Sequence, residues 1–142
     1  MAGPIILTVE RHIDAPPERV FDAWLDADAV GHWLFATPDG VMERIEIDPR
    51  VGGKFLIVER RGCALAEHFG EYLEIDRPRR LAFTFAAMRN AGYTRVAVTI
   101  APEGDGSRVT LVHEMDPEWA DYEAKTRQGW TKILEGLART LA

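Results

Sequence analysis

Apolar and polar residues alternate with a period of two over most of the chain, which predicts β-strands. In the first strand, residues 5–13, this alternation places Ile5, Leu7, Val9 and Ile13 on one side. Turn signals then separate further strands at intervals near ten residues: 44–48, 54–60, 64–75, 81–87, 93–101 and 108–114. Such close spacing is typical of an antiparallel meander, so we expect one seven-stranded sheet.

Helical periodicity replaces this alternation in the last stretch, residues 116–141. Its apolar residues recur at intervals of three and four, which places them on one stripe of an α-helix: Trp119, Tyr122, Thr126, Trp130, Ile133, Leu134, Leu137 and Leu141. Asp116 suits the N-cap and Pro117 the first helical position. Two shorter helices are expected after the first strand, one beginning near Asp14 and one over residues 28–34.

A long amphipathic helix must bury its apolar stripe, so one face of the sheet should cover it. The side chains expected on that face are Leu81, Phe83, Phe85, Val96, Val98, Ile100, Val109, Leu111 and His113. The chain is therefore expected to form one α+β domain over residues 1–142, with a curved antiparallel sheet around a long C-terminal helix. A curved sheet around one helix leaves a cavity unless side chains fill it.

Composition and charge exclude several classes of function. The net charge of −6 and the absence of a long basic run argue against a nucleic-acid surface. The apolar run at the N-terminus is too short for a signal peptide or a membrane span. Cys63 is the single cysteine, so there is no internal disulfide, and a reducing compartment fits. We expect a cytoplasmic protein without a cofactor.

Several stretches of the chain resemble the START-like superfamily, also called SRPBCC or the helix-grip fold. They are IDAPPERVFDAWLDADAVGHWL, DPRVGGKF, GEYLEIDRPRRLAFTF, SRVTLVHEM and QGWTKILEGLARTL. Within it, the chain is most similar to the branch named after the activator of the ninety-kilodalton heat-shock protein ATPase. This resemblance implies the helix-grip fold and a cavity for a hydrophobic ligand. The superfamily includes lipid carriers, hormone receptors, polyketide cyclases and co-chaperone domains, so the resemblance names no ligand.

The histidines do not form a metal-binding motif. His12, His32, His68 and His113 are scattered, without HxxxH spacing, and no CxxC occurs. His113 shares the parity of the inward-facing residues, so we expect it near the long helix. There it either orients a polar group of a ligand, or acts as a general base, or is a core-edge histidine bonded within the protein. His68 is compatible with either face of its strand.

Aromatic residues supply the other candidates for a ligand site. Trp33 and Trp119 flank loops beside the expected cavity mouth, and we predict that both touch a ligand together with His113. The predicted wall behind them consists of Phe83, Phe85, Tyr122 and Trp130. Arg11 interrupts the apolar side of the first strand. We expect a bulge or bend to turn it to water; the alternative is an inward guanidinium bound to a carboxylate or an anionic ligand.

Three functions are compatible with this sequence. The first is binding of an apolar or aromatic small molecule in the cavity. The second is a protein-interaction module of the chaperone-cofactor type, with an exposed patch on the outer face of the sheet. The third is a cyclase-type enzyme, which needs a titratable group in the cavity, and only His113, Arg11 and Tyr93 are candidates. The edge strand that begins at Arg44 makes a homodimer plausible.

Overall fold

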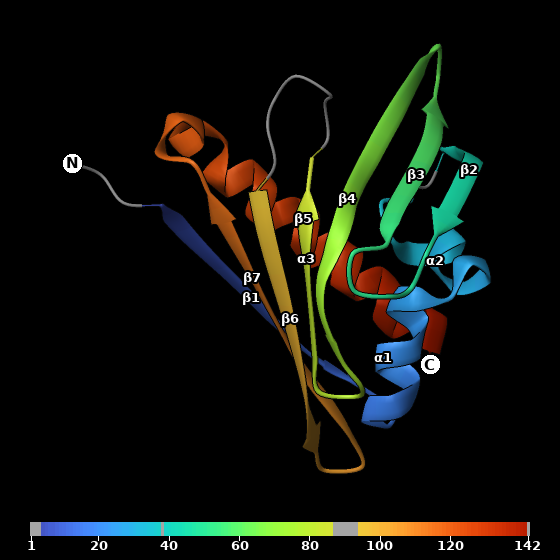
Figure 1. Ribbon diagram of the computed structural model, residues 1–142, viewed down its shortest axis with the longest axis vertical. Coiled ribbons are helices and arrows are strands. Elements are labelled where there is room, and N and C mark those ends of the chain that lie inside the picture. Colours follow the sequence, from blue (N-terminus) through green and yellow to red (C-terminus); the bar gives the residue numbers. More distant parts are fainter. Residues whose placement is uncertain (1–3, 38, 87–93, 142) are drawn as a thin grey trace.

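The computed structural model describes residues 4–37, 39–86 and 94–141, apart from the side chain of Trp119. Its elements follow the predicted order (Figure 1). They are β1 (Ile5–Ile13), α1 (Pro17–Leu25), α2 (Ala27–Trp33), β2 (Val41–Ile47), β3 (Lys54–Arg61), β4 (Ala64–Asp76), β5 (Arg80–Phe85), β6 (Thr94–Glu103), β7 (Gly106–Met115), a 3-10 helix (Pro117–Tyr122) and α3 (Glu123–Leu141). The expected α+β helix-grip architecture is confirmed.

The strands form one antiparallel, seven-stranded sheet in the order β1-β7-β6-β5-β4-β3-β2. Each strand from β2 to β6 pairs with the next along the chain, and β1 completes the sheet by pairing with β7. The meander is therefore confirmed, and β2 lies at an edge of the sheet as expected. Pairing of this edge with a second copy of the chain stays a prediction.

One face of the curved sheet is covered by helices (Figure 1). α3 crosses it diagonally and buries Trp130, Leu134, Leu137 and Leu141. The predicted inward residues of the central strands are buried, apart from the half-buried Phe85. α1 packs against β6 and β7 and α2 packs against β2, and together they bury Phe21, Trp24, Val30 and Trp33. No helix among the described residues is long and apolar enough to cross a membrane.

The start of the C-terminal helical region differs from the prediction of one continuous α-helix. Asp116 caps the region as expected and accepts a hydrogen bond of 2.9 Å from the backbone N–H of Glu118. The next six residues, Pro117–Tyr122, form a 3-10 helix, and α3 begins only at Glu123. A 3-10 helix has three residues per turn, which moves Tyr122 off the apolar stripe. Tyr122 is 50% exposed.

Arg11 reaches water by a different route from the one expected. The pairing of β1 with β7 runs without a shift from Ile5↔Met115 to Ile13↔Ser107, so the expected bulge is wrong. Arg11 pairs with the buried Val109 and is nevertheless exposed. Because β1 is an edge strand, a long side chain there extends past the covered face without a bend.

Candidate functional site

A cavity of about 610 Å³ lies between α3, the loop after α2 and the strands β3 to β5. Its floor and walls are largely aromatic and apolar, and its rim carries charged side chains from β3 and α3. The lining residues are Phe35, Ala36, Thr37, Arg61, His68, Phe85, Thr126, Gly129, Trp130, Lys132, Ile133, Glu135 and Arg139. A drug-sized ligand fits within this volume.

The aromatic wall is a set of closely packed rings. The ring of Phe35 lies parallel to the imidazole of His68, with centroids 4.2 Å apart and an interplanar angle of 3°. Phe35 also stacks on Phe85 at 5.2 Å, and Trp130 packs at 5.8 Å against both phenyl rings. A flat aromatic ligand would meet faces and edges of rings that already stack on one another, which is favourable for offset stacking.

Phe35 holds an unusual backbone conformation at this wall. Its φ is +57°, in the left-handed region that bulky residues rarely adopt. Two groups from β3 hold the loop in place. Arg61 donates a hydrogen bond of 3.1 Å to the carbonyl oxygen of Phe35. Glu59 accepts from the backbone N–H of Thr37 at 2.7 Å and from its hydroxyl at 2.9 Å.

Glu59 and Arg61 form a charged pair beneath this loop. The Glu59 side chain is 1% exposed, and Arg61 Nε donates to its Oε1 at 2.6 Å. Burial acts to raise the pKa of the Glu59 carboxyl, but the hydrogen bonds from Arg61 and Thr37 outweigh it and lower that pKa. The carboxylate is therefore charged at neutral pH, with both oxygens bonded.

His68 is a buried polar residue in the cavity wall. It is 8% exposed, and its Nδ1 has no hydrogen-bond partner in the described part of the chain. Burial and the charge of Arg61 lower the pKa of His68 to about 4, against the opposing effects of a hydrogen bond with the Ile57 backbone and of Glu59. At neutral pH the cavity wall therefore contains a neutral imidazole with unused hydrogen-bonding capacity.

His113, by contrast, has both ring nitrogens occupied within the protein. Trp130 Nε1 donates to His113 Nδ1 at 3.0 Å, which requires the proton of the neutral ring to sit on Nε2. Nε2 then donates to the hydroxyl of Thr94 at 2.7 Å, and Thr94 donates to the carbonyl of Phe85 at 3.1 Å. Burial lowers the pKa of His113 to about 4. Of the expected alternatives, the geometry matches the core-edge histidine.

The predicted ligand residues fall into separate groups. Phe85 and Trp130 line the cavity. Trp33 is 2% exposed and packs edge-on against Trp24 at 4.7 Å, so its expected place at the mouth is wrong. Phe83 borders an interior void of about 10 Å³, too small for anything larger than one water molecule. Side chains thus fill the space around Phe83 in the middle of the sheet, and the cavity lies beside α3 and the loop after α2.

Two further predicted residues lie outside this cavity. Tyr122 belongs to the 3-10 helix and is absent from the described lining. The side chain of Trp119 is outside the described residues, as is Tyr93. Sequence patterns missed Phe35, because it lies in a loop without periodicity, and Arg61, because it ends a strand. The sequence singled out His68 without fixing its direction.

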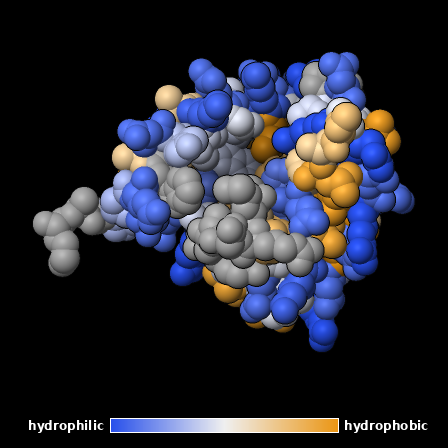
Figure 2. Space-filling view, turned by 90° about the horizontal axis from the view of Figure 1, so that it is seen from above, coloured by the Kyte–Doolittle hydropathy of each residue, from blue (hydrophilic) through white to orange (hydrophobic). Residues whose placement is uncertain are grey.

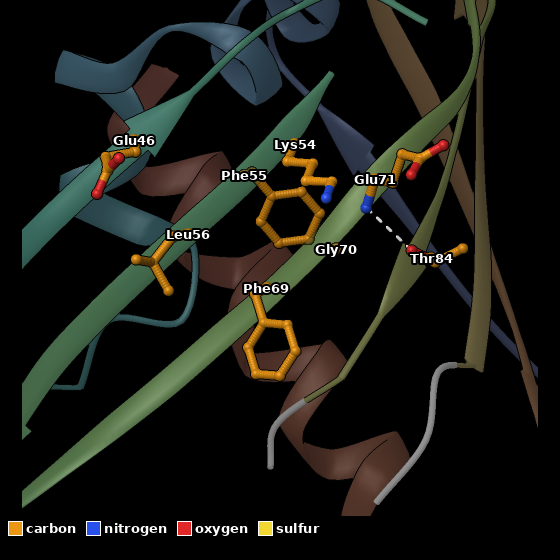
Figure 3. A pocket seen from close by; sticks show the side chains of 8 residues that line it. All are labelled: Glu46, Lys54, Phe55, Leu56, Phe69, Gly70, Glu71 and Thr84. Carbon is orange, nitrogen blue, oxygen red and sulfur yellow. Dashed lines mark hydrogen bonds between the residues drawn. The ribbon is translucent and has the colours of Figure 1, made fainter. Parts of the chain in front are cut away.

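A second hollow, of about 540 Å³, lies on the face of the sheet away from α3 (Figure 3). Lys54 and Glu71 face each other across β3 and β4 beside it. It lies where the regular pairing of β4 with β5 is interrupted beside Gly70, and there the Thr84 hydroxyl accepts the N–H of Glu71 at 2.9 Å. No buried histidine or strained backbone residue lines it among the described residues, so the cavity under α3 is the stronger candidate.

Neither hollow contains a recognisable metal site. Within the described ranges, no group of three or more His, Cys, Asp or Glu side chains is placed to hold an ion. The nearest clustering of such groups surrounds His12, whose ring nitrogens contact Glu103 at 2.6 Å and Asp14 at 3.0 Å. Both ring nitrogens of this exposed histidine are thereby used in an ion-pair network rather than directed at a common point.

Comparison with known proteins gives one family and many similar structures. The model of the family described as "Activator of Hsp90 ATPase homolog 1-like protein" matches residues 14–142. No curated protein is similar enough in sequence to count as a relative.

Two of the similar structures come from bacterial proteins above 25% identity. The chain is similar to protein CV1439 from Chromobacterium violaceum, with 26% identity, 96% of each chain covered and a TM-score of 0.84. It is similar to the AHSA1-like protein from Aeromonas hydrophila, with 28% identity, 96% and 91% coverage and a TM-score of 0.82. Protein NE0264 from Nitrosomonas europaea, at 19% identity, 96% and 94% coverage and a TM-score of 0.83, shares the fold.

Proposed function

The chain belongs to the family of Activator of Hsp90 ATPase homolog 1-like proteins, and from this premise we propose that it binds an apolar or aromatic small molecule in the cavity under α3. The observation that carries the proposal is the aromatic wall of Phe35, Phe85 and Trp130 around an accessible volume of about 610 Å³. Burial of ligand carbon supplies affinity at about 25 cal/mol per Å² of apolar surface. In this proposal Nδ1 of His68, which has no hydrogen-bond partner in the described part of the chain, supplies a polar contact.

Gly129 provides a way to close the cavity without disturbing the core. It lies on α3 in the cavity lining, and a Cβ added there meets no atom within 4 Å. A Gly129→Trp side chain therefore has room to enter the cavity. Gln128→Trp is the matched control, because Gln128 is exposed on the same helix and is absent from the cavity lining.

The test is a thermal-shift screen with fatty acids, sterols, flavonoids and small aromatic compounds on the three proteins. A compound at a hundred times its dissociation constant stabilises the native state by about 2.7 kcal/mol, which raises the midpoint by several degrees. We expect a selective shift for the unsubstituted protein and Gln128→Trp, and none for Gly129→Trp. A shift that survives in Gly129→Trp places binding elsewhere, and no shift across the panel contradicts the proposal.

A chaperone-cofactor role is the second candidate, and a surface feature favours it. Val41, Arg60 and Leu65 are cross-strand neighbours on the outer face of β2, β3 and β4, and all three are exposed. Figure 2 shows apolar side chains exposed among charged ones at this end of the molecule. Exposed apolar side chains flanking a cation are a feature of protein-interaction sites.

The second candidate predicts a direct interaction with an Hsp90-type chaperone. Leu65→Glu and Val41→Glu should each weaken binding by tenfold or more in a titration with the purified chaperone. Val51→Glu, an exposed position in the turn between β2 and β3, is the control. No binding of the unsubstituted chain would remove this candidate. An enzymatic role has less support, because His113 is fully bonded and Arg11 points to water.

A further inference from the structure

The charges at the cavity rim indicate a class of ligand. Resting on the proposed binding function, we propose that the ligand is an aromatic acid, whose ring system packs on the Phe35–Phe85–Trp130 wall and whose carboxylate, sulfonate or phosphate group meets Arg139 and Lys132 at the rim.

The cavity lining has an excess of positive charge. Arg61, Lys132 and Arg139 line it, and Glu135 is the one acid among the described lining residues. Arg61 is balanced by Glu59, which leaves Lys132 and Arg139 against Glu135. The chain as a whole carries a net charge of −6, so this surplus opposes the overall field of the protein. A rim of this sign attracts anions and repels cations.

The two rim cations are free to bind a ligand. Neither Lys132 nor Arg139 forms a hydrogen bond or ion pair with any residue that the structure describes. Other exposed arginines, such as Arg77 with Asp22, are already bonded to carboxylates. An unpaired guanidinium beside a concave apolar surface can donate two parallel hydrogen bonds to an acid group.

The Arg139 guanidinium lies close to Gly136, on the side of α3 that faces Trp33. A Cβ added at Gly136 would lie 3.7 Å from Arg139 Nη2 and 3.4 Å from Cβ of Trp33. The Arg139 head group therefore folds along α3 toward the end of α2, from which the Phe35 loop departs. Arg139 lines the same cavity as Phe35, Phe85 and Trp130, and a cation together with an aromatic wall is the combination that an aromatic acid requires.

The buried histidine does not supply the positive charge. His68 is neutral at neutral pH, since burial and the charge of Arg61 lower its pKa to about 4. Glu59, the acid whose charge acts on this histidine, is fully bonded, and Glu135 on α3 is the acid in the cavity lining. Selectivity for an anion at neutral pH therefore depends on Arg139 and Lys132.

The test compares two fluorescent probes that differ in one acid group. The anionic probe is 8-anilino-1-naphthalenesulfonate, and the neutral probe is N-phenyl-1-naphthylamine, which has the same ring system without the sulfonate. We expect the unsubstituted protein to bind the sulfonate about tenfold more tightly at low salt, since each exposed ion pair contributes up to about fivefold. This preference should shrink at high salt because exposed charges are screened.

Charge variants then assign the preference to the rim. Lys132→Gln with Arg139→Gln should remove the tenfold preference, because it weakens binding of the sulfonate much more than binding of the neutral probe. Glu135→Gln should act in the opposite direction and tighten sulfonate binding about twofold to threefold. Lys125→Gln is the control: it removes one positive charge from an exposed position of α3 outside the lining, and the preference should persist.

The outcomes separate this inference from the binding function on which it rests. Equal affinity for both probes, unaffected by the rim variants, overturns the aromatic-acid assignment while the cavity still binds. Binding of neither probe, or binding that Gly129→Trp leaves intact, contradicts the cavity itself. A preference for the sulfonate that survives loss of both rim cations also overturns the assignment, because the anion then binds elsewhere.

Discussion

The phenyl ring of Phe35 covers the imidazole of His68, with the two ring planes 3° from parallel and their centroids 4.2 Å apart. Phe35 belongs to the loop after α2, and His68 belongs to β4, so the contact joins two segments far apart in sequence. It also joins a strained backbone residue to a buried group with an unpartnered nitrogen. A strained backbone residue in contact with a buried polar atom that has no hydrogen-bond partner is typical of binding sites.

Substitution of Phe35 separates the contribution of its ring from the strain of its backbone. Phe35→Ala should lower the free energy of unfolding by about 3 kcal/mol, since it removes a buried aromatic side chain. Phe35→Gly should be less damaging than Phe35→Ala by about 1 kcal/mol, because glycine adopts a φ of +57° without steric penalty. Urea unfolding of both variants measures the order, and a less stable glycine variant would show that the backbone is unstrained.

The Glu59–Arg61 pair should respond asymmetrically to the loss of each partner. Arg61→Gln leaves a carboxylate that is 1% exposed without its counter-ion and should lower the free energy of unfolding by about 3 kcal/mol at pH 7. Glu59→Gln leaves a 40% exposed guanidinium that water can hydrate, so we expect a loss of about 1 kcal/mol. Denaturation by guanidinium chloride compares them, and equal losses would contradict the asymmetry.

The buried histidines predict a loss of stability on acidification. The pKa of His68 and that of His113 each lie at about 4 in the folded protein, below the ordinary value of 6.5. Between pH 6.5 and pH 4 the unfolded chain takes up protons that the native protein does not. The free energy of unfolding should therefore fall with falling pH, by up to about 1.4 kcal/mol per pH unit for each histidine.

A variant that removes one of these histidines checks the assignment. His113→Gln should roughly halve the slope between pH 6.5 and pH 5, where carboxyl groups contribute least. The absolute stability of this variant at pH 7 will be lower, because Trp130 Nε1 loses its acceptor. The slope is therefore the informative quantity, and a slope unchanged from the unsubstituted protein would mean that His113 does not titrate differently on folding.

Two glycines should respond in opposite ways to alanine. A Cβ at Gly70 would lie 1.8 Å from the carbonyl oxygen of Thr84, so Gly70→Ala must push apart the backbones of β4 and β5. We expect a loss of at least about 2 kcal/mol in the free energy of unfolding. Gly129→Ala meets open space within α3 and should gain about 1 kcal/mol from helix propensity. Thermal unfolding of both variants tests this contrast.

The strands and the long C-terminal helix were predictable because each produces a regular spacing of apolar residues in the sequence. Strands bury one face, so alternation at Leu7, Val9 and Ile13 specified both the strand and the buried side. The stripe on residues 116–141 likewise specified a long helix, and Asp116 its start. The 3-10 turn before Glu123 was not predictable, because the same apolar residues suit either helical period.

The sequence by itself determined the sheet order of a meander, the covering helix, the family resemblance and the inward direction of Phe85, Trp130 and His113. Only the tertiary structure decided which of these residues line the cavity. The two ring nitrogens of His113 are occupied by hydrogen bonds with Trp130 and Thr94. The ring of Phe35, which lies in the loop after α2, covers the imidazole of His68. Periodicity reports the side on which a residue is buried, whereas a binding site depends on gaps between elements distant in sequence, and those gaps arise only when the elements pack.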